Sequence, residues 1–293
     1  MRLVGLFSFA TRATRAARAT RAPLVSSLGL GAMLLACAGK SSESTATEES
    51  ALLGQDGTDT NEVEAQTSSL TATFALAPSA SAAMSVEAAL ASAEDVRAYF
   101  APAGCLTVTT DAARDQATYV FDACSGPWGL VHVMGTVVAT YTTVTTPAGA
   151  PAIHIDAVGT ALHLRRATAD YHASATIVTS GIARAMSWTG ELSGVTARGR
   201  AFQRSAAWDV RWRIGEACVD IDGTAKGDVR GRSFVTTVRH YARCRDACPQ
   251  AGGDVTVTDV ATGRAVDIAY DGSSIAIATS NGSASAIALA CGL

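Results

Sequence analysis

The sequence lacks most of the features by which enzymes and nucleic-acid-binding proteins are recognised. It contains no Gly-x-Ser-x-Gly, Ser-x-x-Lys or His-Glu-x-x-His motif, which removes the common hydrolase and metalloprotease signatures. Lysine occurs only twice, as Lys40 and Lys226, and the formal net charge is −3. Nucleic-acid binding needs a basic footprint. We therefore expect no nucleic-acid partner, no cofactor and, on balance, no enzymatic activity.

Long apolar runs are also missing, apart from one near the N-terminus. Residues 1–36 hold five arginines and no acidic residue, and the stretch Pro23–Ala36 is apolar or small. A basic region followed by a short apolar region is typical of a secretory signal peptide. This stretch has 14 residues, whereas a spanning helix needs about 20. Residues 1–36 are therefore predicted to be a signal peptide.

The signal ends in Leu34-Leu35-Ala36-Cys37, which resembles the lipobox of bacterial lipoproteins. Leu34 and Ala36 match that family well, whereas Leu35 is less usual. The resemblance implies that Cys37 carries palmitate-type acyl chains and that the membrane is a partner through this lipid anchor. In the family, Asp after the cysteine favours the inner membrane, so Ala38 favours the outer membrane. The alternative is an ordinary signal peptide that ends near a cysteine.

Residues 37–70 read as a disordered tether between the anchor and the domain. They are rich in Ser and Thr and hold seven acidic residues against one base, Lys40. Leu52 and Leu53 are their only apolar pair. Such a segment cannot bury enough apolar surface to offset the entropy lost on ordering. We expect it to be flexible and extended by the repulsion of like charges.

Seven cysteines are present, and six remain if Cys37 is lipidated. An even number in an exported protein indicates disulfides, although six cysteines permit 15 pairings. Hairpin geometry favours three pairs: Cys105 with Cys124, Cys218 with Cys244, and Cys248 with Cys291. The spacing of Cys244 and Cys248 also fits zinc ligands, but zinc sites more often show two such close pairs.

Residues 71–293 read as one β-rich exported domain. Short runs alternate Thr, Val, Ile and Tyr with polar residues, as strands do. The first strand is expected at 69–76, and the one convincing helix at 85–99, capped by Ser85. The expected strands that follow are 105–110, 116–122, 129–144, 152–165, 170–178, 182–192, 199–214, 217–226 and 232–243. Within 199–214, Phe202, Trp208 and Trp212 share one parity, which indicates a single buried face.

The C-terminal stretch 248–291 is predicted to contain a four-stranded meander. Its runs, 254–260, 264–270, 273–280 and 283–290, are separated by Thr-Gly, Asp-Gly and Asn-Gly. Such dipeptides favour tight hairpin turns. The fold class is therefore mainly β: an antiparallel meander sheet or β-sandwich with one short helix, with a strongly curved sheet as the alternative. Residues 105–127 also resemble segments of uncharacterised β-rich outer-membrane lipoproteins, a likeness that implies no activity.

Three groups of side chains are candidates for chemistry. If the hairpins turn near 147–148 and 167–168, His132, His163 and His172 line up across adjacent strands and could bind a metal or sense pH. A register slip of one residue would scatter them. The run Asp220-x-Asp222-Gly223 with Asp228 hints at a calcium loop, but solvated carboxylates of a hairpin explain it better. Tryptophans 188, 208 and 212 could line a groove, although core packing is the better interpretation.

The sequence thus predicts a lipid-anchored cell-envelope protein that is a non-enzymatic binding or structural module, with an envelope protein or a glycan as its partner. The alternative is a secreted hydrolase or metal-binding protein that uses the histidine cluster. The two differ in one structural feature: an enzyme should place a histidine with a carboxylate and a hydroxyl in a cleft.

Overall fold

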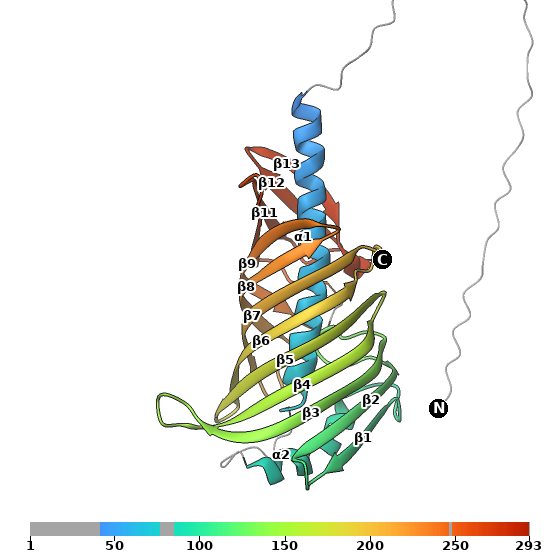
Figure 1. The fold of residues 1–293 in the computed structure, drawn as a ribbon, viewed down its shortest axis with the longest axis vertical. Helices are drawn as coiled ribbons and strands as arrows, with labels where there is room; N and C mark the ends of the chain where they lie inside the picture. The colour runs from blue at the N-terminus through green and yellow to red at the C-terminus, as the bar shows by residue number, and fades with distance from the viewer. Residues whose placement is uncertain (1–41, 77–84, 246–247, 293) are drawn as a thin grey trace, which may run out of the picture. The chain divides into compact units, whose positions relative to one another are not determined.

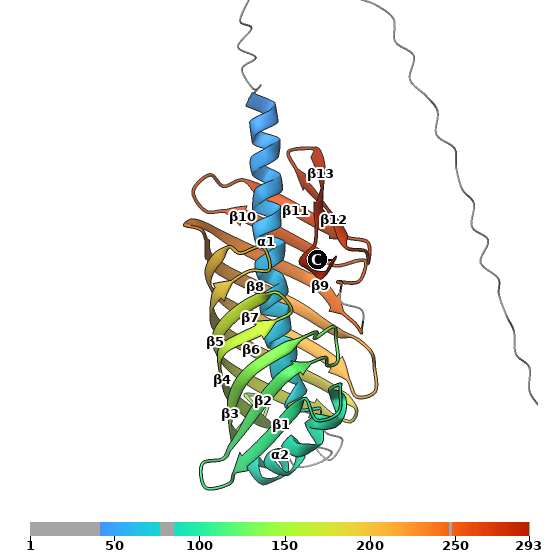
Figure 2. The same ribbon diagram turned by 90° about the vertical axis from the view of Figure 1, so that its right-hand side faces the viewer.

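A computed structural model describes residues 42–76, 85–245 and 248–292, and these form one antiparallel sheet wrapped around a long helix (Figures 1 and 2). Every strand pairs with the next strand along the chain, so the order in the sheet is the order in the sequence. The strands are β1 (Leu106–Asp111), β2 (Gln116–Cys124), β3 (Val133–Thr145), β4 (Pro151–Leu164), β5 (Ala167–Ser180), β6 (Ala183–Val195), β7 (Ala201–Arg213), β8 (Val219–Val229), β9 (Arg232–Arg243), β10 (Asp254–Asp259), β11 (Ala265–Tyr270), β12 (Ile275–Ser280) and β13 (Ser283–Ala288). The predicted mainly β antiparallel meander is confirmed, as a single sheet and not a sandwich.

Strict alternation gives the sheet a buried inner face and a wet outer face. In β7, Phe202, Trp208 and Trp212 are buried, whereas Asp209 and Arg211 are exposed. Side chains of successive strand residues point to opposite faces, so this parity follows directly from the sequence. The expectation that the tryptophans pack in the core is met, because Trp188, Trp208 and Trp212 all lie on the inner face.

The C-terminal meander continues the same sheet, since β10 pairs with β9 as well as with β11. The Asn281-Gly282 turn has positive φ at both residues, 50° and 79°, as the predicted two-residue hairpin requires. The Asp271-Gly272 turn differs. Residues 271–274 form a wider loop in which the Asp271 carboxylate accepts one hydrogen bond, of 2.8 Å, from the Ser273 N–H, and only Gly272 has positive φ.

The sequence prediction is wrong for the segment that precedes the sheet. Ser42–Thr73 forms the 32-residue helix α1, where a disordered tether and the beginning of a strand were expected. From Leu53 onward the helix lies inside the concave face of the sheet, and most of its side chains are buried. Its first turns project beyond β13 (Figures 1 and 2). The part of the chain with the lowest apolar content is therefore its central element.

The hydroxyl groups of α1 explain how so polar a helix is buried. From Leu53 onward, six threonine and serine hydroxyls donate to backbone carbonyls three or four residues earlier in the helix. These bonds join Thr58 to Gln55, Thr60 to Asp56, Thr67 to Val63, Ser68 to Ala65, Thr71 to Thr67 and Thr73 to Leu70. Such bonds satisfy the hydroxyl within the helix itself. The side chains then need no water and can pack against the sheet.

The one helix that the sequence predicts, 85–99, is present and begins where expected. The α2 helix spans Val86–Ala93, and the hydroxyl of Ser85 accepts a hydrogen bond of 3.1 Å from the backbone N–H of Ala88. A 3-10 helix, η1 (Glu94–Tyr99), continues it. Both lie beside β1–β3, at the end of the sheet away from the projecting turns of α1 (Figure 1). A short 3-10 turn, η2 (Ala290–Gly292), follows β13.

One glycine of α1 sets how closely the helix approaches the sheet. A Cβ atom added at Gly57 would lie 2.3 Å from a methyl carbon of Val257 on β10. We expect Gly57→Ala to destabilise the fold by about 1–3 kcal/mol, as overpacking does, although alanine favours a helix by about 1 kcal/mol. Adding Val257→Ala should recover most of this loss in urea unfolding. Gly54→Ala, whose nearest contacts lie at 3.3 Å, is the control, and equal losses for the two glycines would contradict the close approach.

Among the residues that the structure describes, no helix has both the length and the hydropathy needed to cross a membrane.

Candidate functional site

The interface between α1 and the sheet is built from acid–arginine pairs. Five acidic residues of α1 each meet an arginine that lies far away in the sequence. The pairs are Glu49–Arg264, Asp56–Arg200, Asp59–Arg198, Glu62–Arg243 and Glu64–Arg204. All but the first are largely buried. The acidic residues of this segment, which led to the prediction of a tether, are the groups that bind the helix to the arginines of the sheet.

The innermost pair joins Glu64 to Arg204 of β7, and neither side chain has any solvent exposure. Arg204 Nε donates to Glu64 Oε1 at 2.6 Å, and Arg204 Nη2 donates to the hydroxyl of Thr236 at 2.9 Å. The guanidinium also stacks over the ring of Phe234, 4.5 Å from its centroid, which adds a cation–π contact. Arg204 therefore holds α1 to both β7 and β9.

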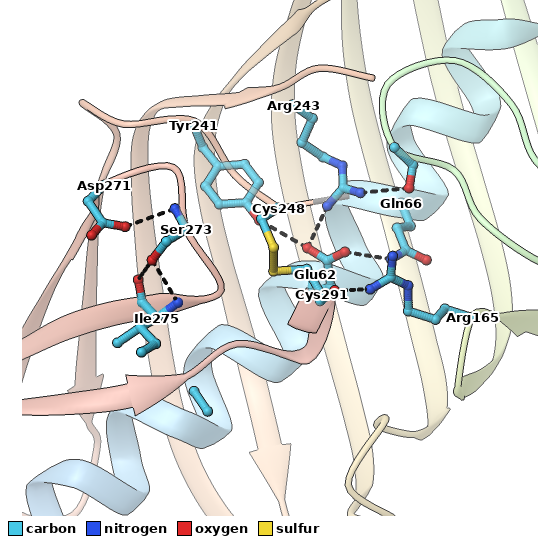
Figure 3. The surroundings of a disulfide bond; sticks show 12 residues. Glu62, Gln66, Arg165, Tyr241, Arg243, Cys248, Asp271, Ser273, Ile275 and Cys291 are labelled. Atoms are coloured by element: carbon cyan, nitrogen blue, oxygen red, sulfur yellow. Dashed lines mark hydrogen bonds and ion pairs between the residues drawn. A yellow bond between two sulfur atoms is a disulfide. The ribbon is translucent and has the colours of Figure 1, made fainter. Parts of the chain in front are cut away.

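Glu62 is the centre of a second buried cluster, shown in Figure 3. Its Oε2 accepts hydrogen bonds from the Tyr241 hydroxyl and from Arg243, and its Oε1 accepts one of 2.6 Å from Gln66. Arg243 also donates to the backbone carbonyls of Trp128 and Gly129 in the β2–β3 connection. Burial alone would lower the pKa of Arg243, but Glu62 and Tyr241 raise it. This cluster ties the helix, the end of β9 and a distant loop together.

A third group of pairs involves the five-residue loop between β6 and β7. Arg198 and Arg200 project from this loop to Asp59 and Asp56. Arg198 also donates to the backbone carbonyl of Ala288 at the end of β13. One loop thus contacts both the helix and β13, the strand at one edge of the sheet.

Burial of these charged pairs removes them from water, which costs free energy and makes each acid dependent on its arginine. Burial raises the pKa of Asp59 to about 6, against the lowering effect of Arg198 and Arg200. Burial likewise raises the pKa of Glu64, although Arg204 opposes the shift. Among the described protein atoms, Asp59 Oδ2, Glu64 Oε2 and Arg204 Nη1 have no hydrogen-bond partner. Buried ion pairs contribute little net stability but make the loss of one partner severe.

The structure does not assemble the predicted histidine cluster. His163 lies opposite Met134 and Thr168, and His172 lies opposite Val158 and Glu191. His132 precedes β3 in a left-handed conformation with φ of 52°. Irregularities between Met134 and Thr136 and between Gly159 and Leu162 shift the register. The register therefore does not align His132, His163 and His172 across adjacent strands as the sequence analysis expected, because irregularities of this kind displace every later residue of a strand.

A different histidine meets both a carboxylate and hydroxyl groups. His154 Nδ1 lies 3.0 Å from the Thr176 hydroxyl, and Nε2 lies 3.1 Å from the Ser174 hydroxyl and 3.5 Å from Asp156. These residues stand on the outer face of β4 and β5, where the backbone N–H groups point toward neighbouring strands. The structure thus places this histidine beside one carboxylate and two hydroxyls on the outer face of two adjacent strands.

The six cysteines after Cys37 form three disulfides: Cys105–Cys124, Cys218–Cys244 and Cys248–Cys291. These are the pairs that the hairpin argument favours, and they exclude Cys244 and Cys248 as zinc ligands. Cys248–Cys291 lies beside the Glu62 cluster (Figure 3). Cys37 and the segment that resembles a lipobox lie outside the described residues. Of the suspected calcium run, Asp220 and Asp222 lie on the outer face of β8, whereas Asp228 lies near the other end of that strand.

Sequence reasoning missed the arginines of the inner face. One signal was present: Arg204 shares its parity with Phe202 and Trp208, which are buried residues of the same strand. A charged residue at a core position demands a buried partner of opposite charge. No protein-family model, curated protein or solved structure matches the chain.

Proposed function

We propose that this protein is a lipid-anchored envelope protein that acts as a non-enzymatic binding or structural module. The observation that supports this most is the position of α1. It begins at Ser42, five residues after the lipobox cysteine Cys37. Force applied to the acylated residue would therefore be transmitted to a helix that four buried acid–arginine pairs hold inside the sheet. The anchor would be joined to the core of the domain without a long flexible tether.

The projecting part of α1 then determines how far the sheet stands from the membrane. About 11 residues separate the beginning of the helix from Leu53, where burial starts. At 1.5 Å per residue this is roughly 16 Å of helix. We propose that this stub spaces the sheet from the lipid surface, with the outer membrane favoured over the inner by Ala38.

Partners of this module would meet the outer face of the sheet, because α1 fills the inner one. The outer face of β4–β9 carries a broad hollow in which charged side chains gather. The side chains of its lining that belong to the outer face include Asp170, His172, Glu191, Lys226 and Asp228, and the buried Arg204 also borders it. An envelope protein or a glycan is the partner that we propose for this surface. The three disulfides support an oxidising compartment outside the cytoplasm.

Mass spectrometry of the N-terminal peptide, together with membrane fractionation, tests the anchor. We expect the wild-type peptide to begin at Cys37, to carry acyl chains and to sediment with membranes. Two or more chains give a lasting anchor, whereas one is marginal. A variant in which a cleavable, non-lipoprotein signal replaces residues 1–37 should fold and be soluble, and Ala38→Ser should stay acylated. A soluble, unmodified wild-type protein would overturn the proposal.

A further inference from the structure

We propose that Asp220, Asp222 and His240 form a binding site for a divalent transition-metal cation of the zinc type. Asp220 and Asp222 belong to β8, and His240 belongs to the adjacent strand β9. One ligand atom from each lies within 4.8 Å of the other two. The site is on the outer face of the sheet and is separate from the interface between α1 and the sheet.

An irregularity in the pairing of β8 and β9 brings the three residues together. The register shifts between Ile221 and Gly223, opposite His240. His240 takes a left-handed conformation with φ of 52°, and its backbone N–H donates to Asp222 Oδ1 at 2.8 Å. Bulges of this kind redirect a side chain from its regular position. Here the bulge places the imidazole beside two carboxylates of the neighbouring strand.

The distances fit a bridging ion better than direct hydrogen bonds. His240 Nδ1 lies 3.9 Å from Asp220 Oδ2 and 3.9 Å from Asp222 Oδ1. A hydrogen bond between such atoms would span about 2.7–3.2 Å. Zinc binds carboxylate oxygen and imidazole nitrogen at about 2.0–2.2 Å, so an ion between two ligands spans up to about 4 Å. The His240 side chain is 75 % exposed, which leaves it free to adjust.

Arg211 of β7 pairs with the same two carboxylates that a cation would bind. Its Nη1 lies 2.8 Å from Asp222 Oδ2 and 3.9 Å from Asp220 Oδ2. The Arg211 side chain is 54 % exposed, and exposed ion pairs of this kind are weak. A divalent ion that gains two carboxylates and an imidazole can therefore displace the guanidinium. Arg211 then acts as a competitor whose removal should strengthen metal binding.

The ligand set distinguishes this site from the calcium loop that the sequence suggested. An imidazole suits zinc, copper and nickel, whereas calcium takes oxygen ligands alone. Asp228, the third residue of the suspected calcium run, lies opposite Ser233 and Gln203 at the other end of β8. Three protein ligands also leave a coordination position open for water or another ligand.

Titration calorimetry with Zn²⁺ and the visible absorption of bound Co²⁺ test the site on the full mature chain, with its disulfides formed. We expect one saturable site. His240→Ala should weaken binding at least about tenfold, since even changes outside the ligand shell cost that much. Asp222→Asn should do the same, although its amide oxygen still accepts the His240 N–H. Arg211→Gln should bind more tightly than wild type.

His163→Ala is the matched control, because His163 is an exposed strand histidine away from the cluster. It should leave both measurements unchanged. Binding that survives His240→Ala, or that is lost equally in His163→Ala, would show adventitious surface binding and overturn the site. Absence of saturable binding in wild type and in Arg211→Gln would overturn it as well. Circular dichroism of each variant checks that the fold is intact.

Discussion

Replacing Arg204 by methionine is expected to destabilise the folded domain by about 3–5 kcal/mol, the usual cost of leaving one member of a buried pair without its partner. Glu64 would remain inside the sheet with no solvent exposure. Methionine keeps much of the volume of the arginine stem, so the loss would report the charge and its hydrogen bonds more than a cavity. Urea unfolding under oxidising conditions measures the free energy of unfolding.

The double variant Arg204→Met with Glu64→Leu separates this pair from general packing effects. It removes both charges, so we expect it to recover most of the stability that Arg204→Met loses. Purely additive losses in the cycle would contradict a coupled pair. Arg264→Met is the matched control and should lose much less stability, because its partner Glu49 is 55 % exposed.

The pH dependence of Arg204→Met provides an independent check. Burial already raises the pKa of Glu64 in the folded protein, and removing Arg204 takes away the group that opposes this shift. A raised pKa means that the folded state binds a proton more readily than the unfolded state. The penalty is then absent below the unfolded pKa, near 4.5, and grows as the pH rises toward the folded pKa. The loss in Arg204→Met should therefore be smaller at pH 5 than at pH 8.

The sheet was predictable because its signals are local. Strand alternation, hairpin dipeptides and the nearest-neighbour disulfides each depend on residues within one or two hairpins of each other. Asn281-Gly282 shows this most plainly, since the dipeptide alone fixes the turn and so the pairing of β12 with β13. The strand register around the histidines differs from the predicted one for a related reason. The irregularities in β3 and β4 leave no clear mark in the alternation of apolar and polar residues.

The helix was not predictable from the composition of its own segment. Whether this segment folds as a buried helix depends on arginines more than 130 residues further along the chain, such as Arg198 for Asp59 and Arg243 for Glu62. A polar segment usually stays in water because its groups find no partners in a core. Here threonine hydroxyls bond to the helix backbone, and the carboxylates meet arginines of the inner face. The combination of an acidic segment with arginine at buried parity was the only available sign.

Removing the Cys248–Cys291 disulfide should produce the second large effect. The two cysteines are 43 residues apart, and the chain-entropy account gives about 4 kcal/mol for a loop of that length. The bond joins the segment after β9 to the C-terminal turn that follows β13, next to the Glu62 cluster. We expect Cys248→Ser with Cys291→Ser to lower the free energy of unfolding by roughly this amount.

The effect should also be local, because β13 has a strand partner on one side only. Without the disulfide, the edge strand keeps its pairing with β12, the contact of Ala288 with Arg198 and its packing against α1. Hydrogen exchange should show β12 and β13 losing protection before β5–β8, since edges open at lower free energy than the centre of a sheet. The Cys105→Ser and Cys124→Ser pair is the control, with a shorter span of 19 residues at the other edge. Removing this disulfide should lower the free energy of unfolding by less and should expose β1 and β2 instead. Identical exchange patterns for the two variants would refute the idea that each disulfide stabilises its own edge of the sheet.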